Sequence, residues 1–284
     1  MKMKNKLLIL GYGYTAQILA ASLDSSKWII YGTSRSKTND PYCSIINYAK
    51  PEIQKALESS THILVSIAPN ENGDVIYQDF QDIIAHSKYI KWIGYLSSTV
   101  VYGNHDGAWV DETTTTKPEG KRGIQRLLAE NQWINFGKKE KKAVNVFRLS
   151  GIYGKDRNAL KQVSLEKARS INKPKQVFSR IHVEDTANII KSAMQHFSRS
   201  AIYNLADDYP CSSIEVNNYA ASLLKTTPPK IIDYEAADLP EMAKEFYKSN
   251  RRISNQKIKN ELGINLIYPT YKEGILKLFK DRHY

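Results

Sequence analysis

The fold is decided near the N-terminus by the stretch Lys6-Leu7-Leu8-Ile9-Leu10-Gly11-Tyr12-Gly13-Tyr14-Thr15-Ala16-Gln17-Ile18-Leu19-Ala20. Residues 7–10 form a short apolar run, which predicts a buried strand of a parallel sheet. The run ends at the pattern Gly11-x-Gly13-x-x-Ala16, and apolar residues then recur at helical spacing. The stretch therefore predicts a strand, a tight turn and a helix, in that order.

Each small residue of this turn suits the binding of a dinucleotide. Gly11 permits the tight turn, and Gly13 has no Cβ that would keep a pyrophosphate from the backbone. Ala16 lets the helix and the strand pack closely, while the helix N-terminus offers free N–H groups to phosphates. The predicted cofactor contacts of the loop are Gly11, Tyr12, Gly13, Tyr14, Thr15 and Ala16.

The end of the second predicted strand, 28–33, favours NADP over NAD. An acidic residue roughly 20 positions after the glycines would bind the ribose 2′-hydroxyl of NAD. The chain has Ser34, Arg35 and Ser36 there instead, and a guanidinium suits a 2′-phosphate. The alternative for Arg35 is a solvated loop cation.

Predicted strands and helices continue to alternate after this point, with strands at 44–48, 61–69 and 91–96 and helices at 51–60 and 77–87. This alternation predicts an α/β fold, a Rossmann doubly wound parallel sheet. The strand at 61–69 ends at the sheet edge where cofactors bind. We therefore add Ser66, Ala68 and Pro69 to the predicted cofactor contacts.

Composition limits the class of protein. The 284 residues are 42% hydrophobic and 25% charged, as in ordinary globular proteins, and the formal net charge is +12. The lysines are spread along the chain without a recognisable nucleic-acid module, so we expect no nucleic-acid partner. No stretch reaches the roughly 18 apolar residues that a membrane span needs, so we expect no membrane partner.

The two cysteines, Cys43 and Cys211, lie far apart in sequence and in no metal or redox spacing. We therefore expect no metal site and a reducing, cytoplasmic location.

Four further segments occur in a characteristic order: Ser97-Ser98-Thr99-Val100-Val101-Tyr102-Gly103, Arg148-Leu149-Ser150-Gly151-Ile152-Tyr153-Gly154, Arg180-Ile181-His182-Val183-Glu184-Asp185-Thr186-Ala187 and Ile202-Tyr203-Asn204-Leu205-Ala206. Together they resemble the extended short-chain dehydrogenases/reductases, the sugar-nucleotide epimerase/dehydratase family. The resemblance spans nearly the whole chain. It implies an NAD(P)-binding Rossmann fold with a smaller C-terminal substrate-binding region.

The chain departs from that family at its catalytic dyad, Tyr-x-x-x-Lys. The aligned stretch has Arg122 in the Tyr position and Arg126 in the Lys position, although Gly123, Leu127 and Glu130 keep the register. An arginine, with a pKa above ~12, cannot donate a proton near neutral pH. The departures resemble the atypical bacterial branch called YeeZ-like, whose reaction is poorly defined.

The resemblance implies a set of site residues. Ser98 takes the family's active-site Ser/Thr position, and Tyr102 is the substitute acid/base; the alternatives are a backbone contact for Ser98 and a structural role for Tyr102. Ser97 and Arg126 are expected to contact the cofactor. For an anionic substrate the candidates are Arg157, Arg180, Arg251 and Arg252. We expect His182 and Asp185 to start a helix, with His182 as general base the alternative.

We therefore expect an NADP-binding domain over 1–155 and 178–206 and a smaller substrate-binding region over 156–177 and 207–284. The expected function is an NADP-dependent oxidoreductase or epimerase acting on a small anionic or sugar-nucleotide-like substrate. The alternative is a non-catalytic NADP(H)-binding sensor or scaffold that has lost the dyad. Helices at 77–87 and 120–136 would allow a homodimer.

Overall fold

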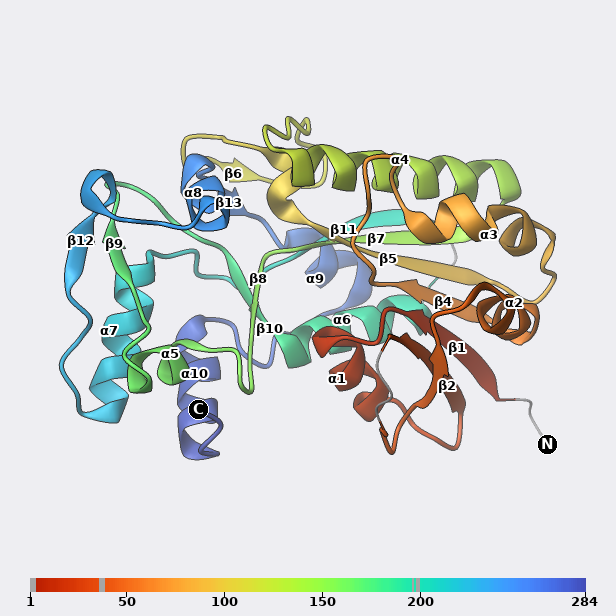
Figure 1. Cartoon of the computed structure of the whole chain (residues 1–284), viewed down its shortest axis with the longest axis horizontal. Helices are drawn as coiled ribbons and strands as arrows, with labels where there is room; N and C mark the ends of the chain where they lie inside the picture. The colour runs from red at the N-terminus through yellow and green to blue at the C-terminus, as the bar shows by residue number, and fades with distance from the viewer. Residues whose placement is uncertain (1–3, 36–38, 196, 198–199) are drawn as a thin grey trace. The chain divides into compact units, whose positions relative to one another are not determined.

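The computed structural model describes residues 4–284 except 36–38, 196 and 198–199. Figure 1 shows the element order along the chain. The chain divides into two compact units, which we describe separately. The first unit comprises Met1–Val101, Lys121–Arg148 and Thr186–Tyr203, and the second comprises Tyr102–Gly120, Leu149–Asp185 and Asn204–Tyr284.

A seven-stranded sheet organises the first unit, with the strand order β11-β7-β5-β4-β1-β2-β3. Its strands are β1 (Asn5–Leu10), β2 (Trp28–Ser34), β3 (Ser44–Asn47), β4 (His62–Val65), β5 (Trp92–Ser98), β7 (Ala143–Leu149) and β11 (Ala201–Leu205). The pairs β1–β2, β2–β3, β1–β4 and β4–β5 are parallel. The strand order reverses between β1 and β4, as in the predicted doubly wound fold, which is confirmed.

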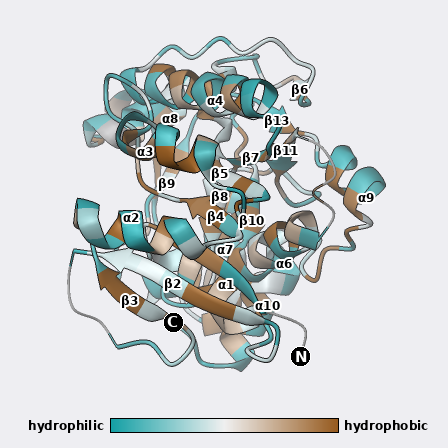
Figure 2. Ribbon diagram, turned by 90° about the vertical axis from the view of Figure 1, so that its right-hand side faces the viewer, coloured by the Kyte–Doolittle hydropathy of each residue, from teal (hydrophilic) through white to brown (hydrophobic). Residues whose placement is uncertain are grey.

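Five helices belong to this sheet: α1 (Tyr14–Ser22), α2 (Lys50–Ser59), α3 (Val75–His86), α4 (Lys121–Glu140) and α6 (Val183–Gln195). Apolar residues of α2, α3 and α4, among them Leu57, Phe80 and Trp133, pack in one core with alternate residues of β1, β4, β5 and β7. This alternation follows from the period of two in a strand. Figure 2 shows the matching hydrophobic stripes on α3 and α4.

The second unit is built from short elements. Three two-stranded parallel pairs are β8 (Gly151–Tyr153) with β10 (Arg180–His182), β9 (Ser170–Asn172) with β12 (Ile231–Asp233), and β6 (Trp109–Val110) with β13 (Arg252–Ile253). Its helices are α5 (Ala159–Ser164), α7 (Ser213–Leu224), α8 (Glu241–Lys248), α9 (Gln256–Leu262) and α10 (Tyr271–Lys280). Two 3-10 helices are η1 (Thr99–Tyr102), which spans the unit boundary, and η2 (Tyr234–Ala236). Helices α5, α7 and α10 enclose a separate apolar core.

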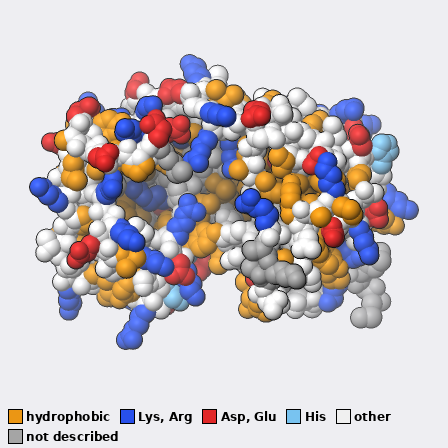
Figure 3. Space-filling model, viewed as in Figure 1, with side chains coloured by type: hydrophobic (Ala, Val, Ile, Leu, Met, Phe, Trp, Pro, Cys, Tyr) orange, Lys and Arg blue, Asp and Glu red, His pale blue; other side chains and the backbone are white. Residues whose placement is uncertain are grey.

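The surface carries charges of both signs. Lys and Arg side chains are interspersed with Asp and Glu on the face drawn in Figure 3. Within the described residues, no helix is both long and apolar enough to cross a membrane. On α4, one of the two helices expected at a homodimer interface, Ile124 is 54% exposed and Leu128 is 39% exposed. The homodimer itself stays a prediction.

Candidate functional site

The loop after β1 lies at the point where the strand order of the sheet reverses. Gly11 has φ +101°, and a Cβ built on it would lie 2.9 Å from Ile67 Cγ1 and 3.1 Å from the Ile67 nitrogen. Gly11 is therefore required both by its backbone conformation and by close packing against the loop after β4. These two loops meet at the carboxyl edge of the sheet, where open α/β folds bind their ligands.

Gly13 faces open space at the start of α1. No described atom lies within 4 Å of a Cβ built on Gly13. As the N-cap residue, Gly13 offers no capping side chain, and the first turn of α1 contains no acidic residue. Ala16 is fully buried behind this turn. The site thus fits a pyrophosphate, because the N–H groups of a helix's first turn have no intrahelical partner and open space lies beside them.

Tyr12 and Thr33 hold the glycine loop against β2. The Gly11 nitrogen donates to Thr33 Oγ1 at 2.9 Å, and the Tyr12 nitrogen donates to the Thr33 carbonyl at 2.8 Å. The Tyr12 ring covers Gly32, where a Cβ would lie 2.6 Å from Tyr12 Cδ2. Burial raises the pKa of Tyr12 well above its usual value. Tyr12 therefore shapes the cofactor loop with its ring turned to β2.

The other predicted contacts of the loop and of β2 differ in exposure. Tyr14 is half-buried in the first turn of α1, whereas Thr15 is buried. At the end of β2, Ser34 is half-buried and Arg35 is exposed. Ser36 lies outside the described residues. The exposed guanidinium of Arg35 follows directly after the strand that the glycine loop contacts.

A side chain of α4 holds the loop after β4. This loop includes Ser66 and Pro69, which are half-buried, and Ala68, which is exposed. The Asp74 nitrogen donates to Gln132 Oε1 at 2.8 Å, and Gln132 Nε2 donates to the Asn72 carbonyl at 2.9 Å. Gln132 thereby fixes both sides of the turn that leads into α3.

Asp74 is the N-cap residue of α3 and is fully buried. Its Oδ1 accepts hydrogen bonds from the Ile76 and Tyr77 nitrogens, each at 2.9 Å. Burial raises the pKa of Asp74 to about 6. The sequence does not predict the hydrogen bonds of Gln132, because those bonds depend on the path of the loop after β4.

Adjacent serines at the end of β5 point to different environments. Ser97 is 2% exposed, and its hydroxyl donates to the buried Glu130 carboxylate. β5 thus turns the Ser97 side chain into the core, towards Glu130, and the expected contact of Ser97 with the cofactor stays a prediction. Ser98 is half-buried, and its Oγ accepts a hydrogen bond from the Val100 nitrogen at 3.3 Å. Ser98 is the serine that remains partly accessible at this strand end.

The arginines that replace the dyad differ in position. Arg122 is exposed in the first turn of α4. Arg126 is half-buried, and its Nη1 donates to the Leu96 carbonyl at 2.5 Å. Arg126 therefore connects α4 to the end of β5, beside Ser98. Gly123 and Glu130, which keep the motif register in the sequence, are buried.

Tyr102, in the second unit, is fully buried. Its hydroxyl donates to Asn204 Oδ1 at 2.7 Å. Asn204 is itself buried, donates from its backbone nitrogen to Glu112 Oε1 at 2.7 Å, and donates from Nδ2 to the Ser254 carbonyl at 3.2 Å. The Tyr102 hydroxyl is thus engaged with Asn204 in this arrangement, and its role as acid/base stays a prediction.

His182 directly precedes α6, and Asp185 lies in the first turn of that helix. The His182 Nδ1 accepts a hydrogen bond from the Glu184 nitrogen at 3.2 Å, so His182 contributes to the helix start as predicted. Asp185 instead accepts from the Ile267 and Tyr268 nitrogens at 2.7 and 3.0 Å. Burial lowers the pKa of His182 to about 4, which favours its neutral form.

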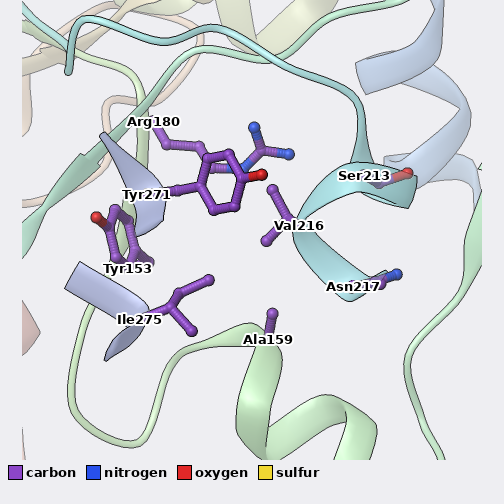
Figure 4. Close-up of a pocket in the computed structure, with 8 residues that line it drawn as sticks. All are labelled: Tyr153, Ala159, Arg180, Ser213, Val216, Asn217, Tyr271 and Ile275. Atoms are coloured by element: carbon purple, nitrogen blue, oxygen red, sulfur yellow. The ribbon is translucent and has the colours of Figure 1, made fainter. Parts of the chain in front are cut away.

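Arg180 lines a cavity of about 200 Å³ in the second unit. Figure 4 shows its guanidinium beside the ring of Tyr271, with Tyr153 and Ile275 on the same side of the cavity. The guanidinium donates to the Phe178 carbonyl at 2.9 Å, to the Cys211 carbonyl at 3.1 Å and to the Ser212 carbonyl at 3.4 Å. Arg180 is thus engaged in holding two chain segments together.

The other three arginines that were predicted to bind the substrate differ in their burial and in their hydrogen-bond partners. Arg251 is half-buried and donates from Nη1 to the Gly103 carbonyl at 2.9 Å; burial lowers its pKa to about 10. Arg252 donates to the Gly107 carbonyl and lines a cavity of about 380 Å³. Arg157 is exposed in a tight turn with Gly154. The described residues contain no group of three His, Cys, Asp or Glu side chains that could hold a metal ion.

The chain resembles solved structures over nearly its whole length. A functionally unknown conserved protein from Silicibacter pomeroyi DSS is 40% identical, with a TM-score of 0.89 over 99% of this chain and 100% of that chain. The chain belongs to the same family as this protein, and its fold is that of the extended short-chain dehydrogenases/reductases of the epimerase/dehydratase type. No protein-family model and no curated protein matches it.

Two structures of known activity share the fold at low identity. The UDP-glucuronic acid 4-epimerase from Bacillus cereus, in complex with UDP-glucuronic acid and NAD, is 14% identical, with a TM-score of 0.79 over 98% of this chain and 100% of that chain. The dTDP-glucose 4,6-dehydratase from Bacillus anthracis, in complex with NAD, is 16% identical, with a TM-score of 0.78 over 97% of this chain and 96% of that chain.

Proposed function

We propose that the protein binds NADP(H) at the glycine loop of the first unit and is an oxidoreductase or epimerase. The observation that carries the proposal is the open space at Gly13, at an N-terminus of α1 without acidic residues. A Cβ at this position would occupy the place that a pyrophosphate takes in such loops. The neighbours from Bacillus cereus and Bacillus anthracis, which bind NAD, support a nicotinamide cofactor for this fold.

The preference for NADP rests on Arg35. The residue follows β2 directly, is exposed, and has serines on both sides in the sequence. A guanidinium donates two parallel hydrogen bonds to a phosphate, which a 2′-hydroxyl cannot accept in the same way.

A bound nicotinamide would supply hydride transfer, and the chain would supply orientation. The Ser98 hydroxyl is the half-buried group at the end of β5 that can donate to a reacting oxygen. Arg126 holds the carbonyl of Leu96, two residues before Ser98, and thereby fixes this strand end. We expect Ser98→Ala to lower turnover without changing the affinity for NADPH.

We propose a small anionic, sugar-nucleotide-like molecule as substrate. Arg251 supports an anion, because burial lowers its pKa and its buried Nε has no hydrogen-bond partner among the described residues. An anionic group would restore the charged state that burial disfavours.

The second candidate function is a non-catalytic NADP(H) sensor or scaffold. It is favoured by the burial of Tyr102, which leaves Arg122 and Arg126 without a replacement acid. The two candidate functions differ in whether the protein turns over a substrate, and both require the binding of NADP(H).

Calorimetric titration of Arg35→Asp tests the cofactor assignment. We expect the variant to lose affinity for NADPH by roughly tenfold or more and to keep its affinity for NADH, because a charge-assisted bond to phosphate is removed. Lys55→Asp on α2, an exposed cation in the same unit, is the charge-matched control. Equal losses for NADPH and NADH would refute the role of Arg35.

A further inference from the structure

Three fully buried side chains of the first unit carry polar atoms that lack a hydrogen-bond partner. Asp74, Tyr95 and Trp133 are each 0% exposed. Within the described part of the chain, no partner exists for Asp74 Oδ2, the Tyr95 hydroxyl or Trp133 Nε1. Buried polar groups in native proteins are nearly always paired, so three such atoms in one unit indicate a role other than packing.

These side chains come from three neighbouring elements. Asp74 caps α3, Tyr95 lies on β5 and Trp133 lies on α4. Helix α3 lies beside α4 (Figure 1). Arg126 and Trp133 stand seven positions apart on α4, so their side chains share one face of that helix.

Arg126 acts on both titratable side chains of this group. Burial raises the pKa of Asp74 to about 6, although two backbone nitrogens of α3, the Trp133 indole and the Arg126 guanidinium act against the rise. Burial also raises the pKa of Tyr95 above its usual value; Arg126 acts against this rise and Asp74 adds to it. Asp74, Tyr95, Arg126 and Trp133 therefore form one electrostatic cluster, which we call the Asp74 cluster.

The other charged groups around the Asp74 cluster have partners of their own. Before α2, the Tyr48 hydroxyl is influenced by the buried carboxylate and by Asp79 and Lys50, which pair with each other at 2.7 Å. Glu130, which acts on the hydroxyl on β5, forms an ion pair with a buried arginine. Arg126 is thus the cation that acts on the buried carboxylate.

Arg126 also places its charge at the carboxyl edge of the sheet. Its Nη1 donates to the Leu96 carbonyl at 2.5 Å, close to the end of β5 at Ser98. Strand β5 is parallel to β4, and β4 is parallel to β1, so the glycine loop follows its strand at the same edge. Open α/β folds bind their ligands at this edge.

We propose that Asp74 is a positioning residue that attracts the Arg126 guanidinium while its carboxyl group is ionised and thereby weakens the attraction of Arg126 for bound NADP(H). When Asp74 takes up a proton from solvent, the guanidinium is released towards the anionic cofactor. Binding of NADP(H) and protonation of Asp74 therefore favour each other. The inference rests on the proposed cofactor and adds a pH response to its site.

Calorimetric titration with NADPH between pH 5 and pH 8 tests this coupling. Asp74→Asn keeps an oxygen for the two backbone nitrogens of α3 but cannot ionise. We expect nearly equal affinities of the wild type and Asp74→Asn at pH 5, and a roughly fivefold weaker affinity of the wild type at pH 8. The ratio of the two affinities reports on Asp74, because the 2′-phosphate of NADPH titrates in both measurements. Asp79→Asn, on the same helix at the surface, is the matched control and should follow the wild-type curve.

The variant Arg126→Gln shows whether Asp74 acts through the guanidinium. In this background, Asp74→Asn should change the affinity at pH 8 by less than about twofold, because the group that responds to the carboxylate is absent. An undiminished fivefold effect would overturn the assignment of Asp74 as a positioning residue.

Tryptophan fluorescence gives a readout that needs no cofactor. The Trp133 emission should change with a midpoint near pH 6 as Asp74 ionises, and this step should be absent in Asp74→Asn. Burial lowers the pKa of His62, beside Trp28, to about 4, so any change from that histidine falls at lower pH.

Two results would overturn the proposal alone: parallel affinity curves for the wild type and Asp74→Asn, or a fluorescence step near pH 6 that persists in Asp74→Asn. A wild type that binds no NADPH at any pH would overturn the proposed cofactor, and the coupling with it. The calorimetry of the wild type therefore distinguishes the two failures.

Discussion

The Arg148 guanidinium donates to the Glu130 carboxylate inside the first unit, from Nη2 to Oε2 at 2.8 Å and from Nε to the same oxygen at 3.1 Å. The side chains of Arg148 and Glu130 are 5% and 0% exposed. Glu130 lies on α4 and Arg148 on β7, and the Ser97 hydroxyl at the end of β5 donates to the same carboxylate. One carboxylate thus connects α4 with two strands of the sheet.

Removing one partner of this pair should leave a buried charge. We expect Glu130→Ala to lower the free energy of unfolding by about 3–5 kcal/mol, because Arg148 would lose its counter-charge in the interior. Glu140→Ala, at a surface ion pair near the end of the same helix, should cost no more than about 1 kcal/mol. Urea denaturation monitored by circular dichroism measures both. Similar losses in the two variants would contradict the assignment.

The two glycines of the cofactor loop should respond differently to a side chain. Gly11→Ala should destabilise the fold by about 1 kcal/mol or more, because φ is +101° and a Cβ would meet Ile67. Gly13→Val should leave the thermal midpoint nearly unchanged, because φ is −102° and the space is open, while abolishing NADPH binding. Differential scanning fluorimetry with and without NADPH separates the two effects. A Gly13→Val protein stabilised by NADPH as much as the wild type would show that the loop is not the phosphate site.

Tyr102→Phe tests the structural role of the buried hydroxyl. The change leaves the Asn204 amide oxygen without its donor, so we expect a loss of about 1–3 kcal/mol in the free energy of unfolding. Cofactor affinity should stay within about twofold of the wild type, because no cofactor contact is removed. A stable variant that loses all turnover would contradict a purely structural role and support Tyr102 as the acid/base.

The pH dependence of stability should carry a signature of Asp207. This residue is 1% exposed, and burial raises its pKa from 3.8 to about 8. The folded protein therefore keeps a proton that the unfolded chain loses at lower pH. The contribution of Asp207 to stability is greatest below about pH 4 and is lost as the pH rises to about 8, with a slope of up to about 1.4 kcal/mol per pH unit.

Asp207→Asn removes this titration and keeps an oxygen for the Tyr209 nitrogen, which Asp207 Oδ1 accepts at 3.1 Å. Denaturation of both proteins at several pH values should give similar stabilities near pH 4 and an increasing advantage of the variant towards pH 8. Parallel curves over this range would show that Asp207 is ionised in the folded state.

The framework of the first unit follows from the sequence because each strand is a short apolar run and each helix has an apolar period. The helix expected over 51–60 is observed as Lys50–Ser59, and that over 77–87 as Val75–His86. Such patterns are local, so the sequence specifies them without knowledge of tertiary contacts.

Side-chain direction at the site depends on contacts distant in sequence. Ser97 is turned inward to contact Glu130 of α4, 33 positions later, whereas Ser98 is half-buried. Tyr102 is buried, and its hydroxyl donates to a residue 102 positions later. Glu130 of the ion pair with Arg148 stands at a motif position that the sequence shows. No sequence pattern predicts the hydrogen bonds of Asp185 to the backbone of residues 267–268.

The most direct test of the central claim is calorimetric titration of the wild-type protein with NADPH and then with NADH. We predict saturable binding of NADPH, markedly weaker binding of NADH, and no heat of NADPH binding in Gly13→Val. Binding of neither nucleotide to the wild type, or undiminished binding of NADPH to Gly13→Val, would contradict the assignment of the glycine loop as the cofactor site.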